Sequence, residues 1–213
     1  MAVKIGECNK RCNEICRLNL YGHIGQLAQE VKKGIESEGV EVTLFQVPET
    51  LTPEILTKLG APPRNTEIPT ITPDDLKNFD GFAFVPTRYG RAPAQISAFF
   101  DATGGLWATQ ALSKKFATVF VSTGSQNGGQ ETTALTTMPF FAHHGIIYVP
   151  LGYRAPELGG VKDIRGGGPF GAGTIASSDG SRQPSAEELT VAQTHGKHFA
   201  EVVKTYKKGE AAA

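Results

Sequence analysis

Three segments of the sequence are rich in glycine and in hydroxyl or amide residues, and the first two also contain an aromatic side chain. They are residues 19–24 (NLYGHI), 86–90 (PTRYG) and 122–129 (STGSQNGG). The first leads into a helical pattern, where backbone N–H groups and the positive end of the helix dipole can hold a phosphate without a lysine. The other two could flank a flat ring. One such segment usually only turns the chain, but the three together indicate a phosphorylated planar cofactor.

Two other motifs could indicate a metal site and a dinucleotide-binding site, but the evidence for each is weaker. Cys8, Cys12 and Cys16 recur every four residues and could turn three thiolates toward a metal. A tetrahedral site needs a fourth ligand, so reduced thiols are the simpler interpretation and we predict no metal site. Residues 166–171 (GGGPFG) satisfy G-x-G-x-x-G. Because they follow no convincing strand and open no helix, we reject them as a dinucleotide-binding motif.

The hydrophobic pattern predicts the elements that must position these segments. Short apolar runs predict strands at residues 40–47, 82–85, 116–122 and 146–151. Helices are predicted at residues 24–38, 94–102 and 130–142, and from Ser185, which forms a capping box with Glu188. Residues 48–80 form a long excursion with helix starts near Thr52 and Thr72.

Strands that alternate with helices of this length predict a parallel sheet covered on both faces. Ligands of such sheets bind at the carboxyl ends of the strands. The three loop segments are expected at that edge, because each directly follows a predicted strand or the place where a first strand belongs.

Composition narrows the function classes. The chain has 213 residues, 21 Lys and Arg against 21 Asp and Glu, and no apolar run long enough to span a bilayer, which predicts one domain. The balanced charge gives no general reason to bind nucleic acid, so we predict neither nucleic-acid binding nor integral membrane association. The N-terminus shows no secretory signal pattern, and we expect a cytoplasmic protein.

Several blocks of sequence, in a fixed order, carry a family resemblance. They are YGHI (21–24), PTRYG (86–90), TGGLW (103–107), STG (122–124), GQET (129–132), AHHG (142–145), VPLGY (149–153) and DGSRQP (179–184). From about residue 20 to residue 199 the chain resembles the flavodoxin-like NAD(P)H:quinone oxidoreductases of the Trp-repressor-binding-protein-like group, type IV, and its fungal members above all. The resemblance implies an α/β fold: a flavodoxin-like, doubly wound, five-stranded parallel sheet in the order 2-1-3-4-5, with helices on both faces.

The resemblance also implies FMN as the cofactor. The residues implied to contact it are Asn19, Leu20, Tyr21, Gly22, His23 and Ile24 at the phosphate; Thr87, Arg88, Tyr89, Ser122, Thr123, Gly124, Ser125, Gln126, Asn127 and Gly128 around the ring and ribityl chain; and His143, from a neighbouring subunit. Trp107 and Tyr21 resemble the aromatic wall over the flavin where nicotinamide and quinone alternate.

The implied reaction transfers hydride from NAD(P)H to the flavin and then from the reduced flavin to a quinone, in ping-pong fashion. No side-chain acid, base or nucleophile is required, because the cofactor carries the electrons. The implied assembly is a homodimer or homotetramer, with residues 179–183 on the oligomer-building surface.

The first strand departs from the resemblance, because residues 6–18 are polar and charged where an apolar strand is expected. Residues 13–18 could form a compromised strand, although Glu14 and Arg17 would be costly in a buried centre. Alternatively, residues 1–5 form the strand and the rest bulges, or the stretch is a gene-sequence artefact. We divide the chain into an atypical segment (1–18), a flavodoxin-like domain (19–205) and a tail (206–213).

Several roles stay open at this stage. Trp107 could be a core or interface aromatic instead of a wall, and Arg88 could neutralise phosphate or only brace its loop. His143 and His144 are adjacent and point apart, which argues against a shared metal, so one is expected at the cofactor and the other in a structural role.

A different function class competes with the enzyme. It is a catalytically silent flavodoxin-like binding or assembly protein that has lost FMN. Glu14, Arg17 and Asn19 favour this rival, whereas the intact Trp107, Thr87 to Tyr89 and His143 favour the enzyme.

Overall fold

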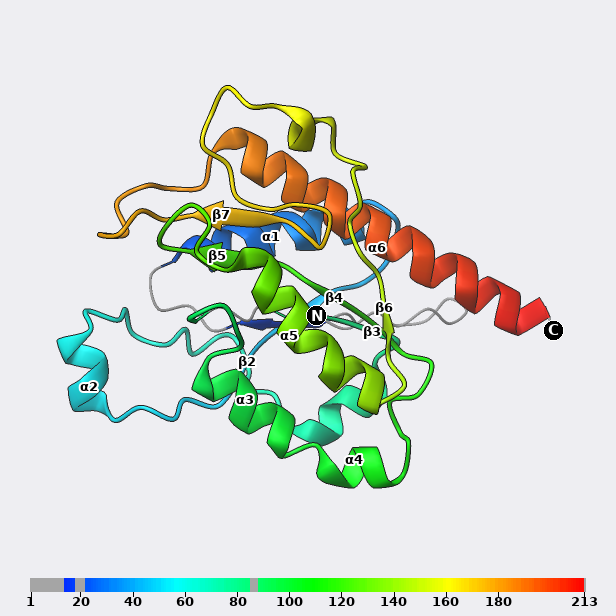
Figure 1. Ribbon diagram of the computed structural model, residues 1–213. Coiled ribbons are helices and arrows are strands. Elements are labelled where there is room, and N and C mark those ends of the chain that lie inside the picture. The colour runs from blue at the N-terminus through cyan, green and yellow to red at the C-terminus, as the bar shows by residue number, and fades with distance from the viewer. Residues whose placement is uncertain (1–13, 18–21, 85–87, 213) are drawn as a thin grey trace.

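The computed structural model describes residues 22–84 and 88–212, and the backbone of residues 14–17 (Figure 1). Its strands are β1 (Glu14–Arg17), β2 (Thr43–Gln46), β3 (Gly81–Phe84), β4 (Phe116–Val119), β5 (Val121–Thr123), β6 (Ile147–Tyr148) and β7 (Gly173–Ile175). Its helices are α1 (His23–Glu36), α2 (Pro53–Lys58), α3 (Ala94–Asp101), α4 (Gly104–Ala108), α5 (Gln130–His143) and α6 (Ala186–Ala212), with the 3-10 helices η1 (Pro73–Asn78) and η2 (Pro156–Gly159).

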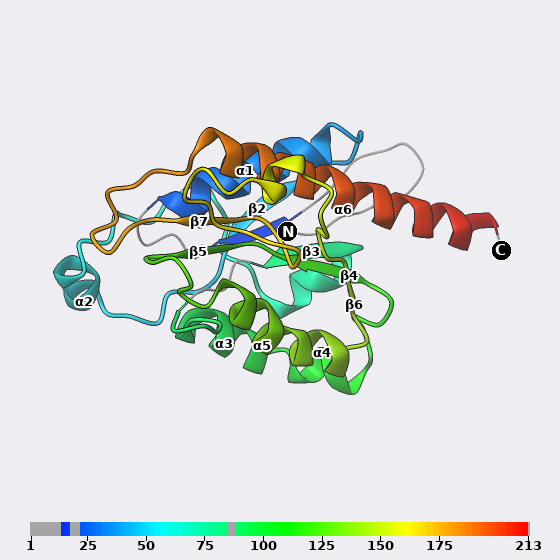
Figure 2. The same ribbon diagram turned by 45° about the horizontal axis from the view of Figure 1, so that its top comes forward.

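Five strands form the main parallel sheet, in the order β2-β1-β3-β4-β6. Its inner strands β3 and β4 are short and buried along their whole length, as their apolar sequences indicate. Helices α1 and α6 cover one face, and α3, α4 and α5 cover the other (Figure 2). The predicted α/β architecture with helices on both faces is confirmed.

The atypical N-terminal segment does supply a strand. Strand β1 lies between β2 and β3, with Ile15 opposite Leu44 on one side and Ala83 on the other. Of the three possibilities for the first strand, the structure shows the one at residues 13–18, as four residues. Cys8 and Cys12 lie outside the described residues.

The single strand predicted at residues 116–122 is wrong, because the chain changes partner at Phe120. The N–H of Phe120 still donates to the Phe84 carbonyl of β3 (3.2 Å), but the N–H of Val121 donates to Ala172 (3.0 Å). From there β5 pairs with β7 in a second, two-stranded sheet. A Cβ on Gly171 would lie 1.9 Å from the Val119 carbonyl oxygen, so only glycine lets the β7 segment approach β4 this closely.

The excursion between β2 and β3 returns to its starting point. The Gln46 amide nitrogen donates to the carbonyls of Asn65 (2.7 Å) and Ile68 (2.6 Å), which fixes the excursion at the end of β2. Both predicted helix starts are present, as α2 and as η1, and the Asp75 carboxylate accepts from the N–H of Thr72 (2.7 Å) at the second.

Helices α1 and α6 pack closely because each presents a glycine to the other. A Cβ on Gly34 would lie 2.0 Å from the Gln193 carbonyl oxygen, and one on Gly196 would lie 2.0 Å from that of Val31. Helix α6 continues to Ala212 and includes most of the segment expected as a tail. Among the helices that the structure describes, none is both long and apolar enough to cross a membrane.

Candidate functional site

The predicted ligand loops converge where the strands end. In Figure 1, β1 and β7 point to the left, and the start of α1 and the start of α5 lie on that side. The described part of this edge contains residues 22–24, 88–90 and 122–129. Of the predicted contacts, Asn19, Leu20, Tyr21 and Thr87 lie outside the described residues.

The start of α1 is suited to an anion. Gly22 precedes the helix with φ of 87°, a conformation that glycine adopts without strain, and the first turn contains no acidic side chain. The N–H groups of Gly25 and Gln26 already bond the Gly22 carbonyl (3.0 and 3.2 Å), so the helix is regular from its first residue. The N–H groups before them point along the helix axis, toward the loop edge.

His23 provides the test of whether a phosphate fits here. Its side chain is only 3% exposed, and its Nε2 atom has no hydrogen-bond partner among the residues that the structure describes. Leaving a buried polar atom without a partner costs about 1–3 kcal/mol. A phosphate oxygen at the start of α1 would supply that partner, so the residues present fit the FMN phosphate.

The second loop is a tight turn that exposes an aromatic ring. Tyr89 and Gly90 have φ of 53° and 71°, and Arg88 and Arg91 exchange backbone hydrogen bonds of 2.7 and 3.1 Å, which is the pattern of a type I′ turn. Tyr89 is 86% exposed, and the Arg88 guanidinium lies 4.9 Å from its ring centroid. The Arg88 guanidinium therefore stabilises the turn through its contact with the Tyr89 ring.

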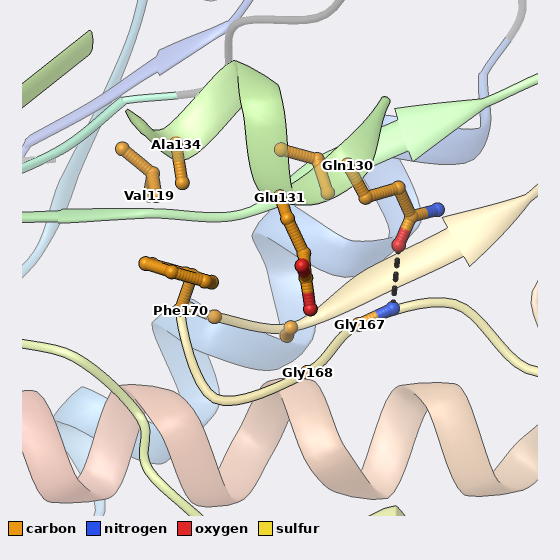
Figure 3. Close-up of a pocket in the computed structure, with 10 residues that line it drawn as sticks. Val119, Gln130, Glu131, Ala134, Gly167, Gly168 and Phe170 are labelled. Carbon is orange, nitrogen blue, oxygen red and sulfur yellow. Dashed lines mark hydrogen bonds between the residues drawn. The ribbon is translucent and has the colours of Figure 1, made fainter. Parts of the chain in front are cut away.

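Gln130, the first residue of α5, holds the third loop, residues 122–129, in place through hydrogen bonds. The Gln130 amide nitrogen donates to Thr123 Oγ1 and to the Thr174 carbonyl, both at 2.9 Å, while its oxygen accepts from the N–H of Gly167 (2.6 Å; Figure 3). Thr123 in turn donates to the Ser125 carbonyl (2.9 Å). The sequence placed Gln130 in the GQET block and at a helix start but gave it no role in the site, although a polar side chain directly after a glycine loop was the available signal.

The second and third loops are locked together through two glycines. A Cβ on Gly129 would lie 2.6 Å from the Gly90 Cα, and a Cβ on Gly90 would lie 2.7 Å from Thr132 Oγ1. The first contact is between two backbones and leaves no room for a larger residue at Gly129, so the end of the third loop lies directly against the Tyr89 turn. A rigid pair of loops is what a flat ring between them requires.

A small cavity lies beneath these loops, between α5 and the glycine-rich turn before β7 (Figure 3). Its volume is about 20 Å³, and its lining includes Val119, Ala134 and Phe170 with Glu131 at the side. That volume holds about one water molecule and cannot hold a flavin ring. The turn itself closes with Gly168 N–H donating to Gly171 (3.0 Å) and leads into β7, not into a helix, which agrees with rejecting it as a dinucleotide motif.

Two predicted site residues lie at the opposite edge of the sheet. His143 is the last residue of α5, whose 14 residues span about 20 Å from the loop edge. Trp107 lies on α4, at the lower right in Figure 1 beside the end of α5, and 56% exposure rules out a core role. The Thr103 hydroxyl before α4 contacts His144 Nε2 (2.9 Å), which joins these ends. Within the part of the chain that the structure describes, one copy does not bring Trp107 and His143 to the loops.

Two buried histidines help to hold the framework of the site. Burial, and then the neighbouring His143, lowers the pKa of His144. Burial lowers the pKa of His195 on α6 to about 3, so this imidazole is neutral. The N–H of Ala172 donates to its Nδ1 (3.2 Å), and its Nε2 lies 2.6 Å from the Thr118 hydroxyl, which donates to Val149 (2.8 Å). This chain of hydrogen bonds joins α6 to the main sheet and to the β7 segment.

Comparison with known proteins gives a consistent result. Residues 17–157 match the family described as NADPH-dependent FMN reductase. Quinone-oxidoreductase QR2 of Triphysaria versicolor is 54% identical over 194 residues, which cover 90% of this chain and 94% of the relative. NAD(P)H quinone oxidoreductase PST2 of Candida albicans is 50% identical over 191 residues, 89% of this chain and 94% of the relative. The minor allergen Alt a 7 of Alternaria alternata is 49% identical over 189 residues, 87% and 93% of the two chains.

Solved structures agree on the fold. The WrbA-like flavodoxin of Agrobacterium tumefaciens superposes with a TM-score of 0.60 at 22% identity, over 92% of this chain and 99% of that one. A flavodoxin from the domain Archaea gives a TM-score of 0.56 at 17% identity, over 91% and 99%. At these identities the likeness establishes the flavodoxin-like fold alone.

Proposed function

The chain belongs to the NADPH-dependent FMN reductase family, and from this premise we propose how its residues hold FMN and how copies of the chain share a site. It is an FMN-dependent NAD(P)H:quinone oxidoreductase. One observation supports this placement of FMN. At one edge of the sheet, a helix start without acidic residues, two loops in close contact and the buried His23 Nε2, which has no hydrogen-bond partner among the described residues, come together.

The FMN phosphate binds at the start of α1 in this proposal. The N–H groups of residues 22–24 and the His23 imidazole would bind it, together with Asn19, Leu20 and Tyr21 by resemblance. The ring and ribityl chain bind between Thr87–Tyr89 and residues 122–128. Bound FMN supplies the two-electron transfer, and the protein contributes positioning and the exclusion of competing reactions.

A second copy of the chain completes the site in this proposal. Trp107 and His143 are exposed and share one edge of the subunit, while the FMN loops occupy the other, so residues of one copy can meet the loops of another. Trp107 would then face Tyr21 across the nicotinamide and quinone position. Two subunits related by a two-fold axis and lying antiparallel would each bring the Trp107 edge to the loop edge of the other, which gives a homodimer, and two dimers give a homotetramer.

Three finer expectations stay part of the proposal. They are a cytoplasmic location, a homodimer or homotetramer as the assembly, and the flavodoxin strand order 2-1-3-4-5. The order β2-β1-β3-β4-β6 of the main sheet supports the last of these when only its own strands are counted.

A visible absorption spectrum tests the proposed site. The purified protein is mixed with FMN, excess FMN is removed, NADH is added under nitrogen, and a quinone follows. We expect a bound flavin spectrum that bleaches with NADH and returns with the quinone. A folded but colourless protein would instead favour the catalytically silent binding protein. The relatives named quinone oxidoreductases, at 50–54% identity, do not favour that alternative.

A further inference from the structure

An ion pair between a partly exposed arginine, Arg182, and a fully buried carboxylate, Glu188, lies close to the segments that border the proposed FMN site. The Glu188 side chain is fully buried near the start of α6, and both of its oxygens accept from Arg182 Nη1 (3.1 and 3.0 Å). The other donors to this carboxylate are the N–H groups of Gly166 (2.9 Å), Ile175 (3.3 Å) and Ser185 (2.8 Å) and the hydroxyl of Thr174 (2.8 Å). A buried carboxylate with this many donors fixes the segments that supply them.

Arg182 extends the same network to further backbone. Its Nη1 also donates to the Ile175 carbonyl (2.7 Å), and its Nη2 donates to Ile164 (2.8 Å). Its own N–H donates to Ala176 (3.0 Å). The planar guanidinium therefore joins the strand β7, the glycine-rich segment and the start of α6 in a fixed geometry that a lysine cannot reproduce.

The residues between β7 and this pair form a turn, residues 177–183, that reaches the phosphate side of the site. The Gln26 amide donates to Gln183 Oε1 (2.8 Å), which links the turn to the first part of α1. A Cβ on Gly180 would lie 4.0 Å from His23 Cε1, so the turn covers the imidazole at the start of the helix.

The other end of the 177–183 turn reaches the ring side. The N–H of Ala176 donates to the Thr123 carbonyl (2.8 Å), at the end of β5. A Cβ on Gly124 would lie 3.5 Å from the Ser177 carbonyl oxygen. The turn thus contacts both the loop that binds the phosphate and the loop that borders the ring.

We propose that Arg182 and Glu188 are positioning residues for FMN, which hold the 177–183 turn so that it sets the spacing between the phosphate loop and the ring loop. The inference rests on the proposed placement of FMN. It gives Arg182 a role within its own subunit, where the sequence had suggested an oligomer surface for this turn. Neither residue touches the flavin in this proposal, so their effect is on FMN affinity rather than on the chemical step.

The main test compares Arg182→Lys with Arg165→Lys, each with and without FMN. Arg165 is a matched control, because it donates to two carbonyls, of Leu158 (3.0 Å) and Gly160 (2.9 Å), and lies 3.6 Å from Glu187, but none of these partners belongs to an FMN loop. We expect the Kd for FMN of R182K to rise about tenfold, the weight of one charge-assisted hydrogen bond, and that of R165K to stay at the wild-type value. Both apoproteins should lose similar amounts of thermal stability, and saturating FMN should restore the turnover of R182K.

Wild-type FMN affinity in R182K, or an equal rise in R165K, would overturn the inference. Failure of the wild type to bind FMN would instead contradict the proposed function. If R182K folds poorly, a second variant tests the same role. Gly180→Ala, at φ of 74°, disturbs the turn without changing the Arg182–Glu188 pair, and Gly39→Ala, at φ of 71°, is its control. Gly180→Ala should weaken FMN binding about threefold relative to Gly39→Ala; equal affinities would contradict the role of the turn.

Discussion

Single side chains decide how much of the site the sequence could reveal. Gly22, Tyr89 and Thr123 were predicted from residue type, because glycine and hydroxyl residues after a strand are informative on their own. Gln130 and His195 were not, since each acts through a partner more than 35 residues away in sequence, Gly167 for Gln130 and Thr118 for His195. A buried hydrogen bond between distant segments leaves no local pattern.

Trp107→Ala tests the aromatic wall. Because the side chain is 56% exposed on α4, its loss should leave the melting temperature and the Kd for FMN close to wild type. The kcat/KM for quinone should fall about tenfold, since stacking on a flat substrate is lost. Steady-state kinetics and a thermal melt measure both, with the 94%-exposed Val161→Ala as control. Loss of folding in W107A would show that the residue is structural.

The buried histidines predict that the protein loses stability in mild acid. The pKa of folded His195 is about 3, below its ordinary value, so the unfolded chain takes up a proton that the folded one refuses. Stability is therefore complete above about pH 6.5 and falls by up to about 1.4 kcal/mol per pH unit toward pH 3. The lowered pKa values of His144 and His198 act in the same direction.

Urea unfolding at pH 7.5, 6.0 and 5.0 measures this dependence. The range stops at pH 5, because below it carboxylates with lowered pKa values, such as Asp179 and Glu54, begin to contribute their own loss. A free energy of unfolding that stays flat from pH 7.5 to 5.0 would contradict a neutral, buried His195.

At the scale of elements, the sequence predicted which segments are helices and strands but not all of their partners. Helix α5 was predicted at nearly its full length, and the capping box of α6 is present, with Glu188 N–H donating to Ser185 Oγ (3.2 Å). The change of sheet at Phe120 was missed, because a continuous apolar run looks the same whether it pairs with one neighbour or with two in succession. Only the approach of Gly171 decides it.

Gly196→Ala should separate α1 from α6. The added Cβ would lie 2.0 Å from the Val31 carbonyl oxygen, and backbone cannot yield as a side chain can. We expect the free energy of unfolding to fall by about 2–3 kcal/mol, despite the better helix propensity of alanine. Gly209→Ala on the same helix meets nothing within 4 Å and should be neutral or slightly stabilising. Equal melting temperatures for the two variants would show that the helices are not in close contact.

At the scale of the whole molecule, the flavodoxin-like α/β class was predictable from the alternation of strands and helices and from the order of the motifs. Whether one subunit supplies all residues of the site was not predictable. The motifs that contain Tyr89 and Trp107 lie close together in the sequence. The fold nevertheless places them at opposite edges of the sheet. Sequence order says which residues serve a site; it does not say how many chains supply them.

Mixing two impaired variants tests whether the site is shared. Trp107→Ala alone should keep about a tenth of the wild-type kcat/KM, and Gly22→Val, which disrupts the phosphate loop, should have almost no activity. If every site takes its loops from one copy and Trp107 from another, random reassembly of the two proteins restores about a quarter of the sites. Turnover after co-expression measures this. Activity no higher than the sum of the separate variants would place Trp107 and the loops in independent roles.

The contact between Gly90 and Gly129 also limits how this enzyme could be redesigned for other quinones. The two loops cannot be diversified independently, because a side chain introduced at either glycine would push its neighbour out of place. A directed-evolution library should hold both glycines constant and vary Tyr89, which is 86% exposed at the tip of its turn. New substrate preferences are then sought at the exposed Tyr89 position, while the contact between Gly90 and Gly129 stays unchanged.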